Sequence, residues 1–188
     1  MTAVTHQLVA LTAGSLVLVN YPQTGGFVLA TIAVIAVMTG ALTPDLDQPA
    51  ANLGNRLLGA KFFGKIVNKF SGGHRHFTHS ILGLLAIGYG LHLIINHWLV
   101  PSLTINAQFV WWVFMVGYAS HIIADTFTDR GVPWLWPLPW HFKIPPGPNV
   151  FRVTTGSFVE LFIVRGILIV VLVIIIRTNL SLFLNFWR

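Results

Sequence analysis

Two short motifs of this chain gather histidine with an acidic or basic neighbour. The segment "GHRHFTHS" places His74, His76 and His79 within six positions, just before a long apolar stretch. Further along, "HIIAD" separates His121 from Asp125 by four positions, so on a helix the two side chains share one face. An imidazole and a carboxylate on one helical turn are an economical pair of ligands for a metal ion.

Other candidate ligands are scattered along the chain. The motif "PDLD" contains Asp45 and Asp47, and a turn after Pro44 would aim both carboxylates to the same side. His6 lies near the start, and Glu160 opens the last apolar stretch. Because imidazoles and carboxylates at this density suit zinc, or two metal ions bridged by a carboxylate, the chemistry that we expect is metal binding.

The composition restricts both the metal and the class of protein. The 188 residues include no cysteine, which excludes disulfides, thiolate catalysis and thiolate metal sites. Histidine and carboxylate ligands favour zinc, with manganese or iron as alternatives. Only 9% of the residues are charged and 55% are hydrophobic, which is typical of a membrane protein. We therefore attribute the net charge of +6 to residues that set membrane topology and expect no nucleic-acid partner.

Hydropathy predicts an all-α fold: one integral membrane domain, residues 1–188, with about five spans. A helix needs about 20 residues to cross a bilayer, and the first stretch is short for this. The loop "GVPWLWPLPWHFKIPPGP" is too rich in proline for a long helix, and "FFGKIVNKF" suits an amphipathic helix at the membrane surface. The apolar stretches are Leu8–Val19, Phe27–Leu42, Ile81–Val100, Phe109–Ala124 and Phe158–Ile176.

Basic residues in the two long polar segments predict the orientation. These residues are Arg56, Lys61, Lys65, Lys69 and Arg75, followed by Arg130, Lys143 and Arg152. Cytoplasmic loops carry an excess of lysine and arginine, so both segments and the N-terminus are expected in the cytoplasm. Arg177 and Arg188 oppose this orientation, two residues against eight.

This topology brings the candidate ligands to one depth. Each lies at the cytoplasmic end of an apolar stretch, whereas His92 and His97 lie at the opposite end and are expected to be polar anchors. A charge within an apolar stretch, as at Arg165, suggests a partner, and an acid is the simplest one. We therefore predict a polar site at the cytoplasmic end of the bundle.

Three motifs carry a resemblance to a known family. Together with His6 and "GSFVE", the segments "TPDLDQP", "GHRHFTHS" and "GYASHIIADTFTDRGVPWLWPL" resemble the YdjM-type family of inner-membrane proteins, to which a metal-dependent hydrolase activity is ascribed. The resemblance runs in order along almost the whole chain. It implies a bacterial or archaeal inner-membrane protein, with a weaker likeness to zinc-dependent phospholipase C. The positions on the family's motifs are Asp45, Asp47, His74, Arg75, Thr78, His79, Ser80, Ser120, His121, Asp125 and Thr128.

The resulting hypothesis is a metal-dependent hydrolase that cleaves a lipid or lipid-linked phosphoester at the cytoplasmic interface. The expected metal ligands are His6, Asp45, Asp47, His74, His79, His121, Asp125 and Glu160. One of Asp45 and Asp47 would orient the attacking water or act as general base, and Arg75 would bind the anionic substrate. The alternatives are a non-catalytic metal-binding or transport protein and a structural membrane protein. The sequence names neither the lipid nor the oligomeric state.

Overall fold

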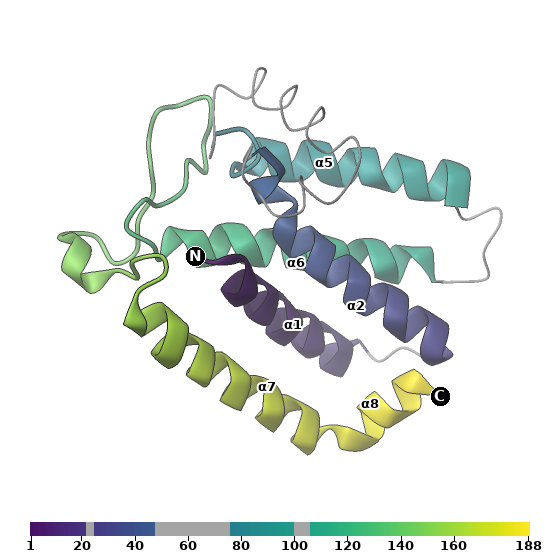
Figure 1. The fold of residues 1–188 in the computed structure, drawn as a ribbon. Helices are drawn as coiled ribbons and strands as arrows, with labels where there is room; N and C mark the ends of the chain where they lie inside the picture. The colour runs from purple at the N-terminus through teal and green to yellow at the C-terminus, as the bar shows by residue number, and fades with distance from the viewer. Residues whose placement is uncertain (22–24, 48–75, 100–105) are drawn as a thin grey trace.

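The computed structural model describes residues 1–21, 25–47, 76–99 and 106–188, and the regular elements within these ranges are all helices (Figure 1). The helices are α1 (Ala3–Asn20), α2 (Gly26–Leu42), α5 (Ile81–Ile94), α6 (Ala107–Thr126), α7 (Arg165–Thr178) and α8 (Leu180–Trp187). Shorter turns are the 3-10 segments Pro44–Asp47 and Asn149–Phe151 and the π-helical segments Ile95–Leu99 and Val159–Val164. The predicted all-α class is confirmed. The predicted surface helix, residues 62–70, lies outside the described residues.

Three of the helical segments are long and apolar enough to cross a membrane, namely Ala3–Asn20, Ala107–Thr126 and Val159–Thr178. Gly26–Leu42 and Ile81–His97 are shorter apolar helices. The five predicted stretches are thus helical as far as the structure describes them, since Val100 lies outside the described residues, but the first helix begins five residues earlier than predicted. It does so because Thr5 and His6 are fully buried inside the bundle, where polar side chains do not interrupt the helix.

Helices α2 and α6 cross in close contact at two glycines. A Cβ atom at Gly40 would lie 2.2 Å from the carbonyl oxygen of Phe114, and one at Gly117 would lie 2.1 Å from that of Val37. Small residues at a helix crossing let two backbones approach, as is common between membrane helices. The crossing brings the C-terminal end of α2 against the last turns of α6.

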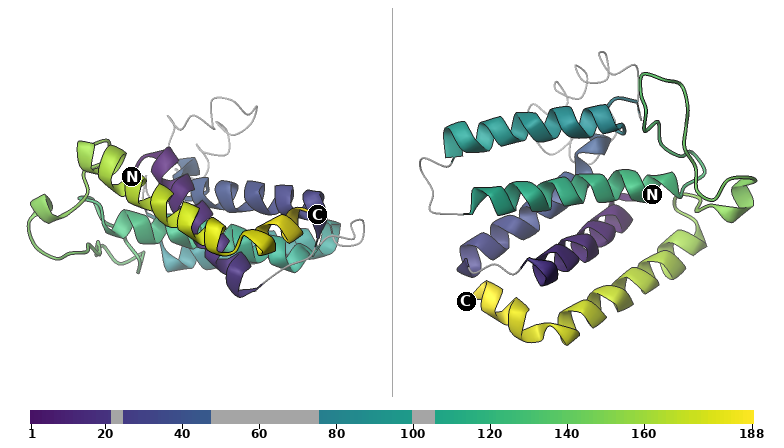
Figure 2. Two further views of the ribbon diagram at one scale, coloured as in Figure 1. Left: turned by 90° about the horizontal axis from the view of Figure 1, so that it is seen from below. Right: turned by 180° about the vertical axis from the view of Figure 1, so that it is seen from behind.

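Helix α1 lies between the α2–α6 pair and α7. Figure 1 and the right-hand view of Figure 2 both place it there, and α1 packs against all three neighbours. Helix α7 is the outermost of these, and no residue of Arg165–Thr178 is buried. Its exposed isoleucines and valines suit contact with lipid rather than water.

Helix α8 was not predicted as a separate element. Helix α7 ends at Thr178, and Asn179 separates it from α8. Helix α8 then turns back and packs against α2. Phe186 is buried there in the apolar core that α1, α2 and α6 share. This core lies toward the end of the bundle opposite the predicted polar site.

The proline-rich segment after α6 is irregular, as predicted, apart from the short turn Asn149–Phe151. Two isolated bridges, Thr128 with Val153 and Val132 with Phe142, hold it together. The indole N–H of Trp134 donates to the Thr126 hydroxyl at 3.0 Å, which fastens the segment to the last turn of α6.

Candidate metal centre

Five of the predicted ligands converge at one end of the bundle. They come from four segments of the chain: His6 in α1, Asp45 in the 3-10 turn after α2, His79 just before α5, and His121 and Asp125 in α6. The histidines and Asp125 are 0% exposed. The Asp45 side chain is 20% exposed, so among these five it alone reaches the surface.

The ligand atoms lie within one small volume. The Nε2 atoms of His79 and His121 are 3.3 Å apart, and Asp45 Oδ1 lies 3.7 and 3.8 Å from them, respectively. Asp125 Oδ2 lies 3.9 Å from His79 Nε2 and 3.8 Å from His121 Nε2. The predicted shared face of His121 and Asp125 is therefore present, and Asp45 closes the cluster from outside α6.

His6 joins this cluster from α1. Its Nε2 lies 3.2 Å from Asp125 Oδ1, and its ring stacks on that of His121 with 3.6 Å between the centroids. Two overlapping sets could hold a metal ion, His6–Asp45–His121 and His79–His121–Asp125, with the ligand atoms of each set within 4.8 Å of one another. Because both sets contain His121, they can form one site or two adjacent sites.

The orientation of His121 comes from the backbone of α2. Its Nδ1 lies 2.6 Å from the carbonyl oxygen of Ala41, and a carbonyl can only accept, so Nδ1 carries the proton. The lone pair of Nε2 then faces the cluster. A hydrogen bond from the distal ring nitrogen to a carbonyl is the usual way in which a protein orients a metal-binding histidine.

His79 is placed by the start of α5 and by a tyrosine of α6. Ser80 caps the helix, since its hydroxyl accepts from the Gly83 N–H at 3.0 Å. The Tyr118 hydroxyl donates to the carbonyl oxygen of Thr78 at 2.7 Å, and the Thr78 hydroxyl lies 3.2 Å from His79 Nδ1. These bonds direct His79 Nε2 toward His121.

The geometry of the cluster fits a bound cation. Both ring nitrogens of His6 are buried and make no hydrogen bond with favourable angles to the described residues. Two imidazole nitrogens 3.3 Å apart repel if both present lone pairs, and a cation between them removes that repulsion. Ligands about 2.0 Å from a tetrahedral zinc ion would be about 3.3 Å apart, close to the shorter distances of the cluster. The amino group of Met1 lies 2.5 Å from Asp125 Oδ1, so that carboxylate oxygen is already paired with a positive charge.

Glu160 is buried at the same end but belongs to neither set of ligands. Its Oε1 accepts from the backbone N–H of Thr2 at 2.6 Å and from the Thr2 hydroxyl at 2.7 Å. Its Oε2 accepts from the N–H of Gly156 at 2.7 Å. Both carboxylate oxygens are therefore engaged by the backbone and by α1.

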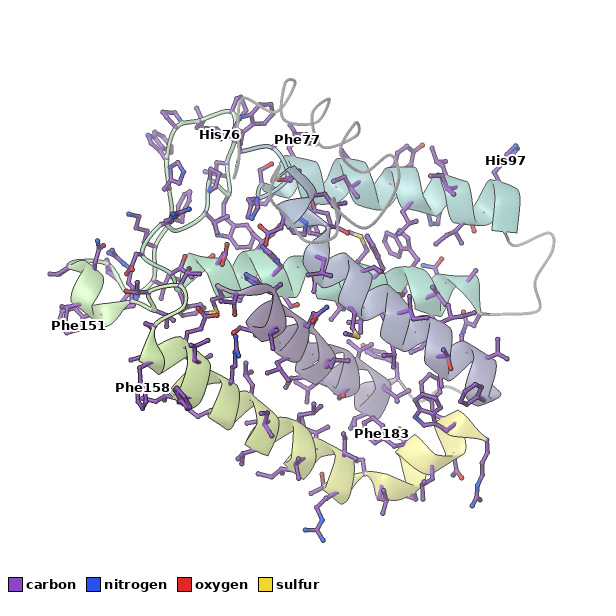
Figure 3. The ribbon with its side chains drawn as sticks, in the orientation of Figure 1. His76, Phe77, His97, Phe151, Phe158 and Phe183 are labelled. Carbon is purple, nitrogen blue, oxygen red and sulfur yellow. The ribbon has the colours of Figure 1, made fainter. Side chains whose placement is uncertain are left out.

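The remaining predicted residues divide into two groups. His74 and Arg75 lie outside the described residues, as does the side chain of Asp47. In the second group, His97 lies at the opposite end of the α5 region from His76 (Figure 3). Near that end, His92 Nε2 lies 2.9 Å from the side-chain amide nitrogen of Asn96. Both histidines are thus away from the cluster.

Sequence reasoning missed the groups that orient the ligands. The Ala41 carbonyl carries no signal in the sequence, because every residue has one. Thr2 and Thr5 offered a weak signal, since two hydroxyls three positions apart precede His6 at the start of an apolar helix. Arg165, expected to pair with an acid, donates instead to the hydroxyls of these two threonines.

An all-helical chain with membrane-length apolar helices and a buried His/Asp cluster at one end is a membrane protein with a candidate metal site. The model of the family described as YdjM inner membrane protein matches residues 1–186. The chain therefore belongs to the YdjM inner membrane protein family, as its motifs suggested.

Individual relatives agree with this assignment. The chain is 34% identical over 135 residues to the inner membrane proteins YdjM of Escherichia coli (strain K12) and Shigella flexneri. That stretch covers 71% of this chain but only 61% of each of those relatives. This chain is also 30% identical over 128 residues to the uncharacterized protein YvsG of Bacillus subtilis (strain 168), and the match covers 68% of each of the two chains. No solved structure matches the chain.

Proposed function

We propose that this protein is a metal-dependent hydrolase of the membrane that cleaves a lipid or lipid-linked phosphoester. The observation that carries the proposal is the convergence of three imidazoles and two carboxylates within the buried cluster. A structural zinc site needs four ligands and is closed, whereas a catalytic site keeps a position for water or substrate. Five described ligands, with more predicted nearby, exceed what a closed site requires.

The proposed roles follow from burial. His6, His79, His121 and Asp125 would hold the metal, which is zinc by preference because nitrogen ligands predominate. A divalent ion bound there supplies Lewis acidity toward water and toward the phosphoryl oxygen. Asp45, which is 20% exposed, is the group suited to position an attacking water and accept its proton. Asp47 and His74 remain predicted ligands from the sequence, whereas both carboxylate oxygens of Glu160 are engaged outside the cluster.

The substrate class follows from the depth and charge of the site. A cluster at the end of membrane helices meets the headgroup region of a lipid, where the scissile bond of a phosphoester lies. Arg75 is the predicted contact for its phosphate, because a guanidinium matches phosphate geometry. The neighbouring lysines and arginines would attract anionic headgroups.

Hydrolysis of a phosphoester tests this proposal. Detergent-purified protein is incubated with phospholipids and lipid pyrophosphates, and the release of headgroup or phosphate is measured. We expect release that a chelator abolishes and that added zinc, manganese or iron restores. If metal is bound and the protein is folded but no ester is cleaved, the hydrolase proposal fails and a non-catalytic metal-binding protein replaces it.

We also propose that the site faces the cytoplasm, together with the N-terminus. Eight lysines and arginines in the two long polar segments favour this orientation. A reporter fused after Lys69 should therefore read cytoplasmic, and one inserted in "YPQTGG" should read external. The reverse pattern would place the site on the other side of the membrane.

A further inference from the structure

A network of hydrogen bonds ties the first turn of α1 to the segment that leads into α7. Arg165 donates from Nε to the Thr5 hydroxyl at 3.1 Å and from a terminal nitrogen to the Thr2 hydroxyl at 2.8 Å. The two hydroxyls are 3.0 Å apart. The Thr2 hydroxyl donates in turn to Glu160 Oε1 at 2.7 Å. The hydrogen bonds thus form a chain in which the Arg165 guanidinium donates to the hydroxyls and the Thr2 hydroxyl donates to the Glu160 carboxylate.

The π-helical segment Val159–Val164 makes this network possible. In an α-helix two residues five positions apart point about 140° away from each other. Here the N–H of Arg165 donates to the carbonyl oxygen of Glu160, an i to i+5 hydrogen bond that brings the two residues roughly one above the other. Both side chains therefore reach the same partner, Thr2, which is the N-cap residue of α1.

A charge within a membrane helix is costly and usually marks a functional role. Arg165 lies within the most apolar candidate span, Val159–Thr178, and no carboxylate lies within 4.0 Å of it among the described residues. A direct ion pair with Glu160 would satisfy the charges without α1. Instead, the Thr2 hydroxyl lies between Arg165 and Glu160 and bonds to both, and Arg165 also bonds to the Thr5 hydroxyl. The two charged side chains therefore fix the start of α1.

The two threonines held by this network come just before a candidate ligand in the chain. Thr5 precedes His6 in the chain, and the backbone N–H of His6 donates to the carbonyl oxygen of Thr2 at 3.1 Å. Fixing Thr2 and Thr5 therefore fixes the helical turn that carries His6. Inside the cluster the His6 ring stacks on His121 and lies 3.2 Å from Asp125 Oδ1, but its ring nitrogens make no hydrogen bond of favourable geometry to the described residues. The turn that carries His6 is therefore held mainly from outside the cluster.

We propose that Glu160 and Arg165 are positioning residues which, through Thr2 and Thr5, hold His6 in the metal centre. This inference rests on the proposed metal site for its consequence, but the placement of His6 can be tested without metal. Glu160 thus acts through α1 rather than as a ligand. Removing such an outer partner of a metal site typically weakens metal binding about 10- to 100-fold.

The first measurement is the reactivity of His6 in metal-free protein. Diethyl pyrocarbonate modifies accessible histidines, and peptide mass spectrometry reports each site, with exposed His141 as the internal reference. We expect His6 to be protected in the wild type and modified about tenfold faster in Arg165→Met, a variant of similar length that cannot donate. Losing one hydrogen bond to a charged group raises the population in which His6 is displaced by about this factor. Arg177→Met, which removes an exposed arginine from the same helix, is the matched control.

The second measurement is zinc affinity. Arg165→Met and Glu160→Gln should each weaken it about 10- to 100-fold, Arg165→Lys should restore part of it, and Arg177→Met should leave it unchanged. If Arg165→Met fails to fold, Glu160→Gln and the near-isosteric Thr5→Val decide the question. Unchanged protection of His6 in folded variants would overturn the proposal. Exposure of His6 in a protein whose wild type binds no zinc would support the positioning role and refute the metal site.

Discussion

Replacing His121 and Asp125 together by alanine is expected to remove nearly all metal from the protein. His121 belongs to both candidate ligand sets, and Asp125 contacts all three histidines of the cluster. Losing both leaves at most His6, His79 and Asp45 of the described ligands, and it removes the one residue that the two ligand sets have in common. Elemental analysis should find about one to two zinc, manganese or iron ions per wild-type chain and almost none in the variant.

The control must separate loss of ligands from loss of a histidine and an aspartate in general. Asp129 and His141 come from the segment that follows the cluster and belong to neither ligand set. Asp129→Ala with His141→Ala should therefore keep its metal. Circular dichroism checks that both double variants remain helical. Full metal content in folded His121→Ala/Asp125→Ala protein would show that the metal is held elsewhere.

Replacing Asp45 by asparagine is expected to stop turnover while metal remains bound. Asparagine has the shape of aspartate but cannot accept a proton, and the four buried candidate ligands are left in place. A general base typically contributes about 10²- to 10⁴-fold, so the rate of ester cleavage should fall by that factor. The measurement is the rate of phosphate or headgroup release, normalised to metal content.

Asp129→Asn is the matched control, because it makes the same change in a carboxylate of the same end of the bundle. It should retain wild-type turnover. Full activity in Asp45→Asn would refute the role of Asp45 as base. Loss of the metal in that variant would instead make Asp45 a ligand, and the base would have to be sought elsewhere.

Local pattern determined the elements of this protein and the chemistry of its site. Long apolar stretches can only be helical in a membrane, because every backbone group needs an internal hydrogen-bond partner. The absence of cysteine limited the ligands to imidazole and carboxylate. The four-residue spacing of His121 and Asp125 is converted by the helical repeat into one shared face, so that pair was predictable from sequence alone.

Alternation of apolar spans and polar segments also determined that the candidate ligands meet at one end. His6, Asp45, His79 and Asp125 are far apart in the chain, but all four lie at the same end of the bundle. His6 and His79 lie where a helix begins, and Asp45 and Asp125 lie where one ends. Their common depth therefore follows from chain direction. What depth does not specify is rotation, that is, which way each side chain points around its own helix.

Rotation was decided by the tertiary structure, through contacts with no local signature. The α2–α6 crossing at Gly40 and Gly117 sets the carbonyl of Ala41 against His121, and so selects its tautomer. The extra residue in the π-helical turn brings Arg165 to the side of Glu160, where an α-helix would have separated them. Glu160 therefore reaches α1 instead of joining a ligand set. Such outcomes depend on how whole helices pack, because a backbone carbonyl or one additional residue per turn leaves the hydrophobic pattern of the sequence unchanged.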